Sequence, residues 1–133
     1  QLDAFAALGV ESLIAVTPYP EDQDRERAAL LAEHGYDVVG TGGLSSTTVA
    51  EFVSEPPSLF YDHATTLAAE VDEPFDAVYL PCAALRLAEY IAPMEEDVGV
   101  PVVTSAQAQV WKAFELGGVN PPMERFGALF DTL

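Results

Sequence analysis

The only cysteine of the chain, Cys82, comes directly after an apolar run that ends at Leu80. A segment with helical spacing follows it. A thiol at the exit of a buried strand and the start of a helix can act as a nucleophile or exchange a proton. A second interpretation stays open, because a lone cysteine is often an inert buried side chain. The elements that surround Cys82 are therefore needed to distinguish a reactive thiol from an inert one.

Four short apolar runs bounded by turn residues predict four strands, at 12–17, 36–40, 76–80 and 100–104. Segments with helical spacing lie before, between and after them, at 1–8, 21–34, 57–71, 84–98 and 110–116. Alternation of this kind predicts an α/β fold, a four-stranded parallel sheet of order 2-1-3-4 with helices on both faces. We interpret residues 1–133 as a single α/β domain.

The residues that follow each predicted strand define the candidate site, because ligands bind at the carboxyl ends of parallel strands. These residues are Thr17 and Tyr19 after the first strand, Ser45 and Ser46 in the loop after the second, Cys82 and Ala83 after the third, and Ser105 after the fourth. In the order 2-1-3-4, Tyr19 and Cys82 face each other. The Tyr19 hydroxyl and the N–H groups of the helix start behind Cys82 would together receive a small anion.

Other polar residues are weaker candidates. His34 and His63 are expected to be structural or solvated, and one cysteine with two distant histidines has no metal-site spacing. Residues 40–43 are glycine-rich but form neither a dinucleotide fingerprint nor a P-loop. Arg25 and Arg27 are expected on the solvent side of the helix over 21–34.

The charge of the chain is unusual for its length. Its 133 residues include 22 acidic and 5 basic ones, a formal charge of −17, and half are hydrophobic. So acidic a surface repels nucleic acid and anionic membranes. The acidic residues are spread along the chain and coexist with a normal pattern of apolar core residues. This favours adaptation to high salt, and an ordinary acidic mesophilic protein is the alternative. Without a visible signal peptide or spanning segment, we expect a cytoplasmic protein.

Several stretches of the chain, in order, resemble the C-terminal half of the Asp/Glu racemase superfamily. Within it, they are most similar to the branch of maleate cis-trans isomerases and arylmalonate decarboxylases. The stretches are 7–10, 15–19, 32–39, 76–85, 99–105 and 126–130. They cover the chain almost from end to end.

The resemblance implies one half of a pseudo-symmetric two-domain fold with the active site between the halves. It implies that Cys82 adds or removes a proton at the carbon next to a carboxylate, without a metal or other cofactor. It also implies that Tyr19 and the Ala83 N–H bind a carboxylate and that the loop at Ser45 and Ser46 adds a polar contact. Two features depart from the family: an asparagine typical of the isomerases is missing, and no second cysteine is present.

These implications rank the possible functions. An isomerase of a small dicarboxylate, similar to maleate cis-trans isomerase, comes first, and a malonate-type decarboxylase comes second. An amino-acid or hydantoin racemase is third, and a non-catalytic anion-binding half-domain is the alternative that is not an enzyme. We expect the chain to be the C-terminal half of a larger protein, inactive when isolated, with a small carboxylate as substrate and a homo-oligomer as assembly.

Overall fold

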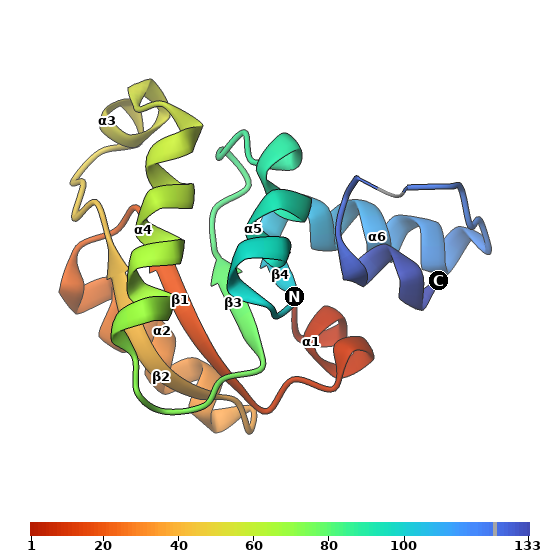
Figure 1. The fold of residues 1–133 in the computed structure, drawn as a ribbon, viewed down its shortest axis with the longest axis horizontal. Helices are drawn as coiled ribbons and strands as arrows, with labels where there is room; N and C mark the ends of the chain where they lie inside the picture. The colour runs from red at the N-terminus through yellow and green to blue at the C-terminus, as the bar shows by residue number, and fades with distance from the viewer. Residues whose placement is uncertain (124) are drawn as a thin grey trace.

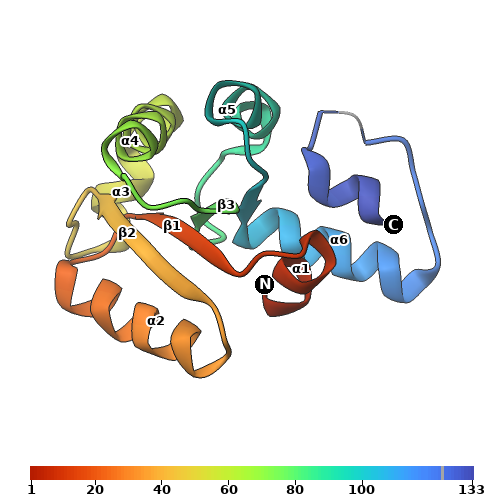
Figure 2. The same ribbon diagram turned by 60° about the horizontal axis from the view of Figure 1, so that its bottom comes forward.

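The computed structural model describes residues 1–123 and 125–133, which form a parallel sheet covered by helices on both faces (Figures 1 and 2). The strands are β1 (Ser12–Thr17), β2 (Asp37–Gly43), β3 (Ala77–Leu80) and β4 (Val102–Thr104). The α-helices are α1 (Leu2–Leu8), α2 (Glu21–Glu33), α3 (Val49–Ser54), α4 (Pro57–Glu70), α5 (Ile91–Val98) and α6 (Ser105–Gly117). Two 3-10 helices are η1 (Ala88–Tyr90) and η2 (Ala128–Thr132).

The strand order is β2-β1-β3-β4 with every pair parallel, which confirms the predicted fold class and order. In register, Leu13 of β1 lies beside Val38 of β2 and Ala77 of β3. The β1–β2 register shifts once, between Leu13 and Ile14. Because β1 and β3 are neighbours at the point where the strand order reverses, the crevice at their carboxyl ends is the place where this fold binds ligands.

The two faces of the sheet bury two separate sets of apolar side chains, because successive residues of a strand point to opposite sides. Leu13 and Tyr79 pack in one cluster with Phe5 and Trp111. On the other face, a second cluster holds Ile14, Val16, Val78 and Leu80 from the strands, together with Phe60 and Met94 from the helices. Figure 2 shows the matching layers, with α4 and α5 over one face and α1, α2 and α6 over the other. Because helices cover both faces of the sheet, residues on both sides of β1, β3 and β4 are buried and these strands are mainly apolar.

Several helix boundaries follow directly from the sequence. Thr48 and Glu51 form a capping box at the start of α3, and Thr104 and Gln107 form another at the start of α6. Gly9 ends α1 with φ of 68°, a left-handed conformation that glycine adopts readily. Pro93 lies in the first turn of α5, a position that tolerates proline.

The loop after β3 is where the structure differs most from the sequence-based expectation. A helix was expected to begin directly behind Cys82, but turns and η1 come first, and the α-helix begins only at Ile91. Leu85 and Leu87 are buried, with 8% and 2% of their surface exposed, although they lie outside any helix. Because both side chains pack into the core, the apolar residues of this irregular segment recur at a spacing similar to that of a helix.

Candidate active site

Cys82 lies at the carboxyl edge of the sheet, just beyond β3, in an unusual backbone conformation. Its φ is 119°, a region that favours glycine, and it is half-buried. The Ser105 hydroxyl at the start of α6 accepts a hydrogen bond from the Cys82 N–H at 3.0 Å. Such a conformation costs about 1–3 kcal/mol and is found most often at functional sites. The residue is therefore held in place by its neighbours, and not by its own preference.

Tyr19, beyond the end of β1, lies against Cys82 as the strand order predicts. Burial, together with the neighbouring Cys82 thiol, raises the pKa of the Tyr19 phenol to about 12. The Tyr19 ring packs edge-on against Phe52 of α3, with the ring centroids 6.0 Å apart. The phenol thus stays protonated near neutral pH and can donate a hydrogen bond beside the thiol.

Thr17 is buried, and its hydroxyl is used inside the protein. It donates to Asp24 Oδ1 at 2.6 Å and accepts from the Tyr19 N–H at 3.2 Å. Burial raises the pKa of Asp24 above its ordinary value, and the Thr17 hydrogen bond and the Arg27 charge oppose that shift. Thr17 was expected to bind substrate, but in this structure its side chain fixes the backbone that carries Tyr19.

The loop after β2 folds over the end of β1. The Leu44 N–H donates to the Thr17 carbonyl at 3.1 Å, and the Ser46 N–H donates to the Pro18 carbonyl at 2.8 Å. Gly43 permits this approach, because a Cβ at that position would lie 1.7 Å from the Thr17 carbonyl oxygen. Ser45 is exposed and Ser46 is half-buried, and so both serines stand near the Tyr19 backbone.

Ala83 and Ser105 complete the set of predicted site residues. Ala83 is exposed in the turn after Cys82, where the Leu85 N–H reaches the Cys82 carbonyl at 3.4 Å. Its N–H cannot belong to a helix start, which corrects the reason for which it was expected to bind an anion. Ser105 is 6% exposed and bonds to the Cys82 backbone. Its role in the structure is to hold the thiol, and direct contact with substrate stays a prediction.

Arg27 is the residue whose position the sequence predicted wrongly. It was expected on the solvent side of α2, but it is half-buried and its guanidinium carbon lies 4.7 Å from the centroid of the Tyr19 ring. The signal was available: Asp24, Arg27 and Leu31 recur at helical spacing, which places them on one face. Asp24 and Leu31 are both buried. In contrast, Arg25 is exposed, as expected, and it pairs with Glu21.

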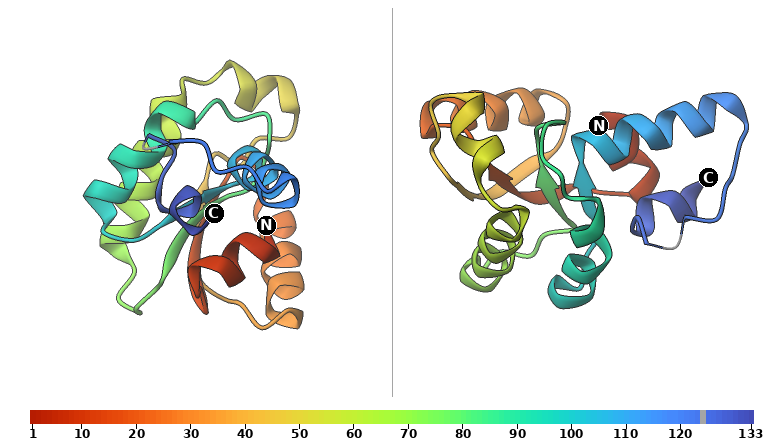
Figure 3. Two further views of the ribbon diagram at one scale, coloured as in Figure 1. Left: turned by 90° about the vertical axis from the view of Figure 1, so that its right-hand side faces the viewer. Right: turned by 90° about the horizontal axis from the view of Figure 1, so that it is seen from above.

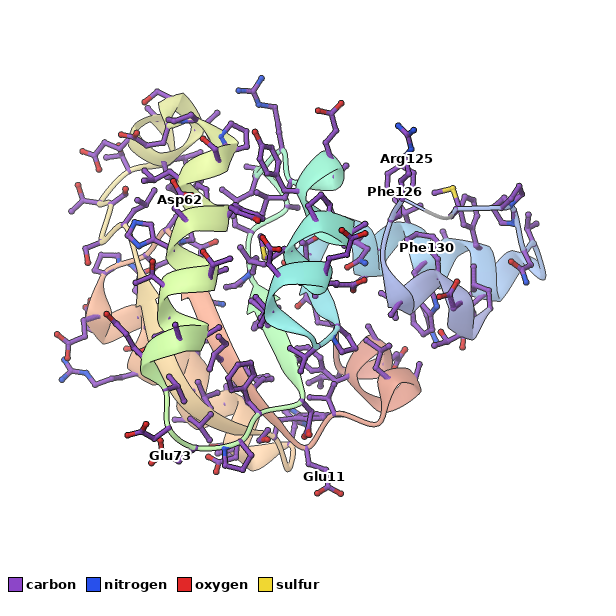
Figure 4. The ribbon with its side chains drawn as sticks, in the orientation of Figure 1. Glu11, Asp62, Glu73, Arg125, Phe126 and Phe130 are labelled. Atoms are coloured by element: carbon purple, nitrogen blue, oxygen red, sulfur yellow. The ribbon has the colours of Figure 1, made fainter. Side chains whose placement is uncertain are left out.

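A cavity of about 170 Å³ lies between the loop after Cys82 and α6. Its lining is mainly apolar and includes Leu85, Leu87, Ile91, Phe126 and Phe130, but neither Cys82 nor Tyr19. Phe126 and Phe130 stand together beside α6 in Figure 4, with Arg125 projecting outward. The thiol and the phenol therefore lie on an edge of the sheet beside this cavity, and not among the residues that line it.

The remaining features carry little site chemistry. Among residues 1–123 and 125–133, no group of three histidine, cysteine or acidic side chains is placed to hold a metal ion. His34 is exposed at the end of α2, and His63 is half-buried on α4. Within the same described residues, no helix is long and apolar enough to cross a lipid bilayer.

Taken together, the fold and the edge define an α/β protein with a single candidate acid–base thiol beside a protonated phenol. The model of the arylmalonate decarboxylase family matches residues 1–130, and the chain belongs to this family. The arylmalonate decarboxylase of Bordetella bronchiseptica is 32% identical over 131 residues, which are 98% of this chain and 54% of that protein. The chain therefore spans about half the length of this curated relative.

Solved structures show the same relationship. A crystal structure of arylmalonate decarboxylase is 30% identical with a TM-score of 0.86, and the match covers 99% of this chain and 58% of that one. The maleate isomerase of Pseudomonas putida S16, solved with maleate, has the same TM-score of 0.86 at 18% identity, over 98% of this chain and 52% of that one. The fold is thus shared with both enzymes, as the resemblance implied.

Proposed function

We propose that this chain carries the proton-transfer side of a decarboxylase that acts on a malonate-type dicarboxylate. The observation that carries the proposal is the pairing of Cys82 with Tyr19 at the crevice between β1 and β3. The membership of the chain in the arylmalonate decarboxylase family supports this reaction over the isomerisation that the sequence ranked first. The maleate isomerases share the fold at low sequence identity.

The proposed reaction needs one proton donor and one anion site. Loss of CO₂ from one carboxylate leaves an electron pair on the α-carbon, which spreads into the second carboxylate as an enediolate. The Cys82 thiol transfers its proton to that carbon, and the resulting thiolate takes a proton from solvent. One proton is therefore consumed, and a dicarboxylate becomes CO₂ and a monocarboxylate.

The residues around the thiol have separate roles in this proposal. The Tyr19 O–H and the exposed Ala83 N–H donate to the carboxylate that remains, where negative charge grows as CO₂ leaves. Ser45 and Ser46 offer further polar contacts from the loop after β2. Ser105 and Thr17 hold the backbones of Cys82 and Tyr19.

The remaining side of the site is also part of the proposal. The relative is about twice as long as this chain, and the Cys82 edge lies outside the neighbouring cavity. We therefore propose that a second α/β half, or a second copy in a homo-oligomer, faces this edge and encloses the substrate. The isolated residues 1–133 are then expected to bind a dicarboxylate weakly and to turn it over poorly.

The alternatives use the same edge with a different outcome. Isomerisation of maleate would need a nucleophile to add to its double bond, with Cys82 handling the proton. Racemisation would use Cys82 to remove and return a proton at one carbon. A non-catalytic anion-binding domain would need Tyr19 and the backbone N–H groups but no reactive thiol.

Product analysis separates these possibilities. The natural gene product that carries this sequence is incubated with phenylmalonate and with maleate, and the products are followed by proton NMR. The proposal predicts phenylacetate and CO₂ from phenylmalonate, and no fumarate from maleate. Fumarate without phenylacetate would establish the isomerase instead. No product, combined with a ligand-induced rise in melting temperature, would establish the binding domain.

A further inference from the structure

The inner face of α2 contributes two polar residues beneath the end of β1. Asp24 is 8% exposed and accepts a hydrogen bond from the Thr17 hydroxyl. The same hydroxyl accepts a hydrogen bond from the Tyr19 N–H. Arg27, one helical turn further along, lies over the Tyr19 ring. The helix therefore supports the backbone of Tyr19 through Thr17 and contacts the ring of the same tyrosine through Arg27. Figure 3 shows α2 on the face of the sheet opposite α4 and α5.

The environment of Arg27 is costly for an arginine. Its Nε is buried and has no hydrogen-bond partner among residues 1–123 and 125–133. An unpaired buried donor destabilises a fold, and such a group in a native structure calls for an explanation. An aliphatic side chain would pack on the Tyr19 ring without this cost. The feature that only the arginine supplies is a positive charge on the ring face.

That charge acts on a phenol whose other neighbours are acidic or apolar. Cys82, just beyond β3, and Tyr79, within β3, lie close enough to influence the Tyr19 phenol, and Phe52 of α3 packs on the ring. The charges of Cys82 and Tyr79 raise the pKa of Tyr19, whereas the charge of Arg27 lowers it. In a chain with a formal charge of −17, Arg27 is the cation that faces this residue. A cation over the ring makes the phenol a stronger hydrogen-bond donor.

We infer that Arg27 is a positioning residue for Tyr19: stacked on the ring from α2, it holds the phenol so that the hydroxyl donates beside the Cys82 thiol. The part of this inference that concerns substrate rests on the proposed function, because the anion that Tyr19 would receive is the substrate carboxylate. The effect of Arg27 on Cys82 through Tyr19 does not depend on any substrate. It can therefore be measured by itself.

Alkylation of Cys82 by iodoacetamide at neutral pH is the readout, and the single cysteine makes it unambiguous. A thiolate that loses the Tyr19 donor is less abundant but more nucleophilic, so Tyr19→Phe is expected to slow alkylation by about threefold. Arg27→Met is expected to slow it by a similar factor, and Arg27→Lys to restore most of the rate. In the double variant Tyr19→Phe, Arg27→Met, the rate should equal that of Tyr19→Phe alone, because Arg27 acts through the phenol.

Arg25→Met is the matched control, since Arg25 lies on the same helix but is exposed. It removes the same charge and should leave the alkylation rate unchanged. The inference is overturned if Arg25→Met matches Arg27→Met, if the two effects multiply in the double variant, or if Tyr19→Phe has no effect. Near-ultraviolet circular dichroism checks folding, and Arg27→Gln replaces Arg27→Met if the latter unfolds.

The same variants distinguish this inference from the proposed function. With phenylmalonate, Arg27→Met should lower kcat as well as raise KM, because Tyr19 donates to a carboxylate whose negative charge grows as CO₂ leaves. If phenylmalonate is not a substrate but the alkylation pattern holds, the decarboxylase proposal fails and the role of Arg27 stands. If phenylmalonate is turned over but the alkylation pattern fails, the decarboxylase proposal stands and the role of Arg27 fails.

Discussion

The Ser105 hydroxyl accepts a hydrogen bond from the Cys82 N–H at 3.0 Å and so joins the start of α6 to the strained residue that follows β3. Cys82 adopts φ of 119° although it carries a side chain. A residue in such a conformation persists only where its surroundings determine it. The position of the thiol is thus built by its neighbours, and the cost of that position should be measurable.

Two substitutions of Cys82 isolate this backbone cost. Both Cys82→Ala and Cys82→Gly remove the thiol, but only glycine adopts φ of 119° without strain. We expect Cys82→Gly to be more stable than Cys82→Ala by about 1 kcal/mol in urea denaturation. At Ala83, which is exposed in the following turn, an Ala83→Gly substitution serves as the control and should not stabilise the protein. Equal stability of the two Cys82 variants would show that the conformation carries no strain.

Thr17→Val tests the hydrogen-bonded chain beneath Tyr19. The substitution leaves the buried Asp24 carboxyl without its donor and the Tyr19 N–H without its acceptor. Loss of such a buried partner is expected to lower the free energy of unfolding by about 1–3 kcal/mol at pH 7. Thr41→Val, at an exposed position on β2, is the matched control and should change stability little. Equal effects of the two substitutions would refute a structural role for the Thr17 hydroxyl.

Asp76 predicts a dependence of stability on pH. Its carboxylate accepts the N–H groups of Ser12 at 2.9 Å and Glu11 at 3.0 Å, and these hydrogen bonds hold the pKa of Asp76 below its ordinary value of 3.8. Because the pKa is lower in the folded state, the stabilisation is present above pH 3.8 and is lost as the pH falls through the folded-state pKa. Asp76→Asn should therefore destabilise the protein at pH 7 much more than in strong acid.

Urea denaturation at both pH values measures this difference. Asp72→Asn removes an exposed carboxylate in the same connection and is the control. A loss for Asp76→Asn that is the same at both pH values would mean that the charge of the carboxylate does not matter.

The acidic surface predicts that salt stabilises the fold. Figure 4 shows Glu11 and Glu73 projecting outward at one edge of the molecule, and the formal charge is −17. Salt screens the repulsion among such exposed charges. We expect the melting temperature to rise by several degrees between low salt and molar KCl, and to rise less in sucrose of equal osmolality. An unchanged melting temperature would rule out the interpretation as adaptation to high salt.

Much of the fold could be predicted because the strands are buried on both faces. Ile14 and Val78 have no polar alternation around them, and short runs of this kind in alternation with helices allow few topologies. The strand order by itself places Tyr19 beside Cys82, without any knowledge of side-chain contacts. The part of the site that depends on topology alone was therefore within reach of the sequence.

The features of the site that depend on tertiary contacts could not be predicted from the sequence. Leu85 and Leu87 are buried from an irregular loop, and their spacing imitates a helix that is not there. The positive φ of Cys82 is imposed by its surroundings, since nothing in the local sequence requires it. For Arg27, the burial of Asp24 on the same helix face outweighs the usual preference of an arginine for solvent.

Decarboxylation of phenylmalonate in D₂O by the wild-type protein and by Cys82→Ala tests the central claim most directly. If Cys82 delivers the proton, the wild type incorporates one deuterium at the α-carbon, and Cys82→Ala loses at least ~100-fold in rate. Phenylmalonate should still raise the melting temperature of Cys82→Ala, because Tyr19 and the backbone donors remain. Turnover at the wild-type rate by Cys82→Ala would show that another group protonates the carbon, and would contradict the role proposed for Cys82.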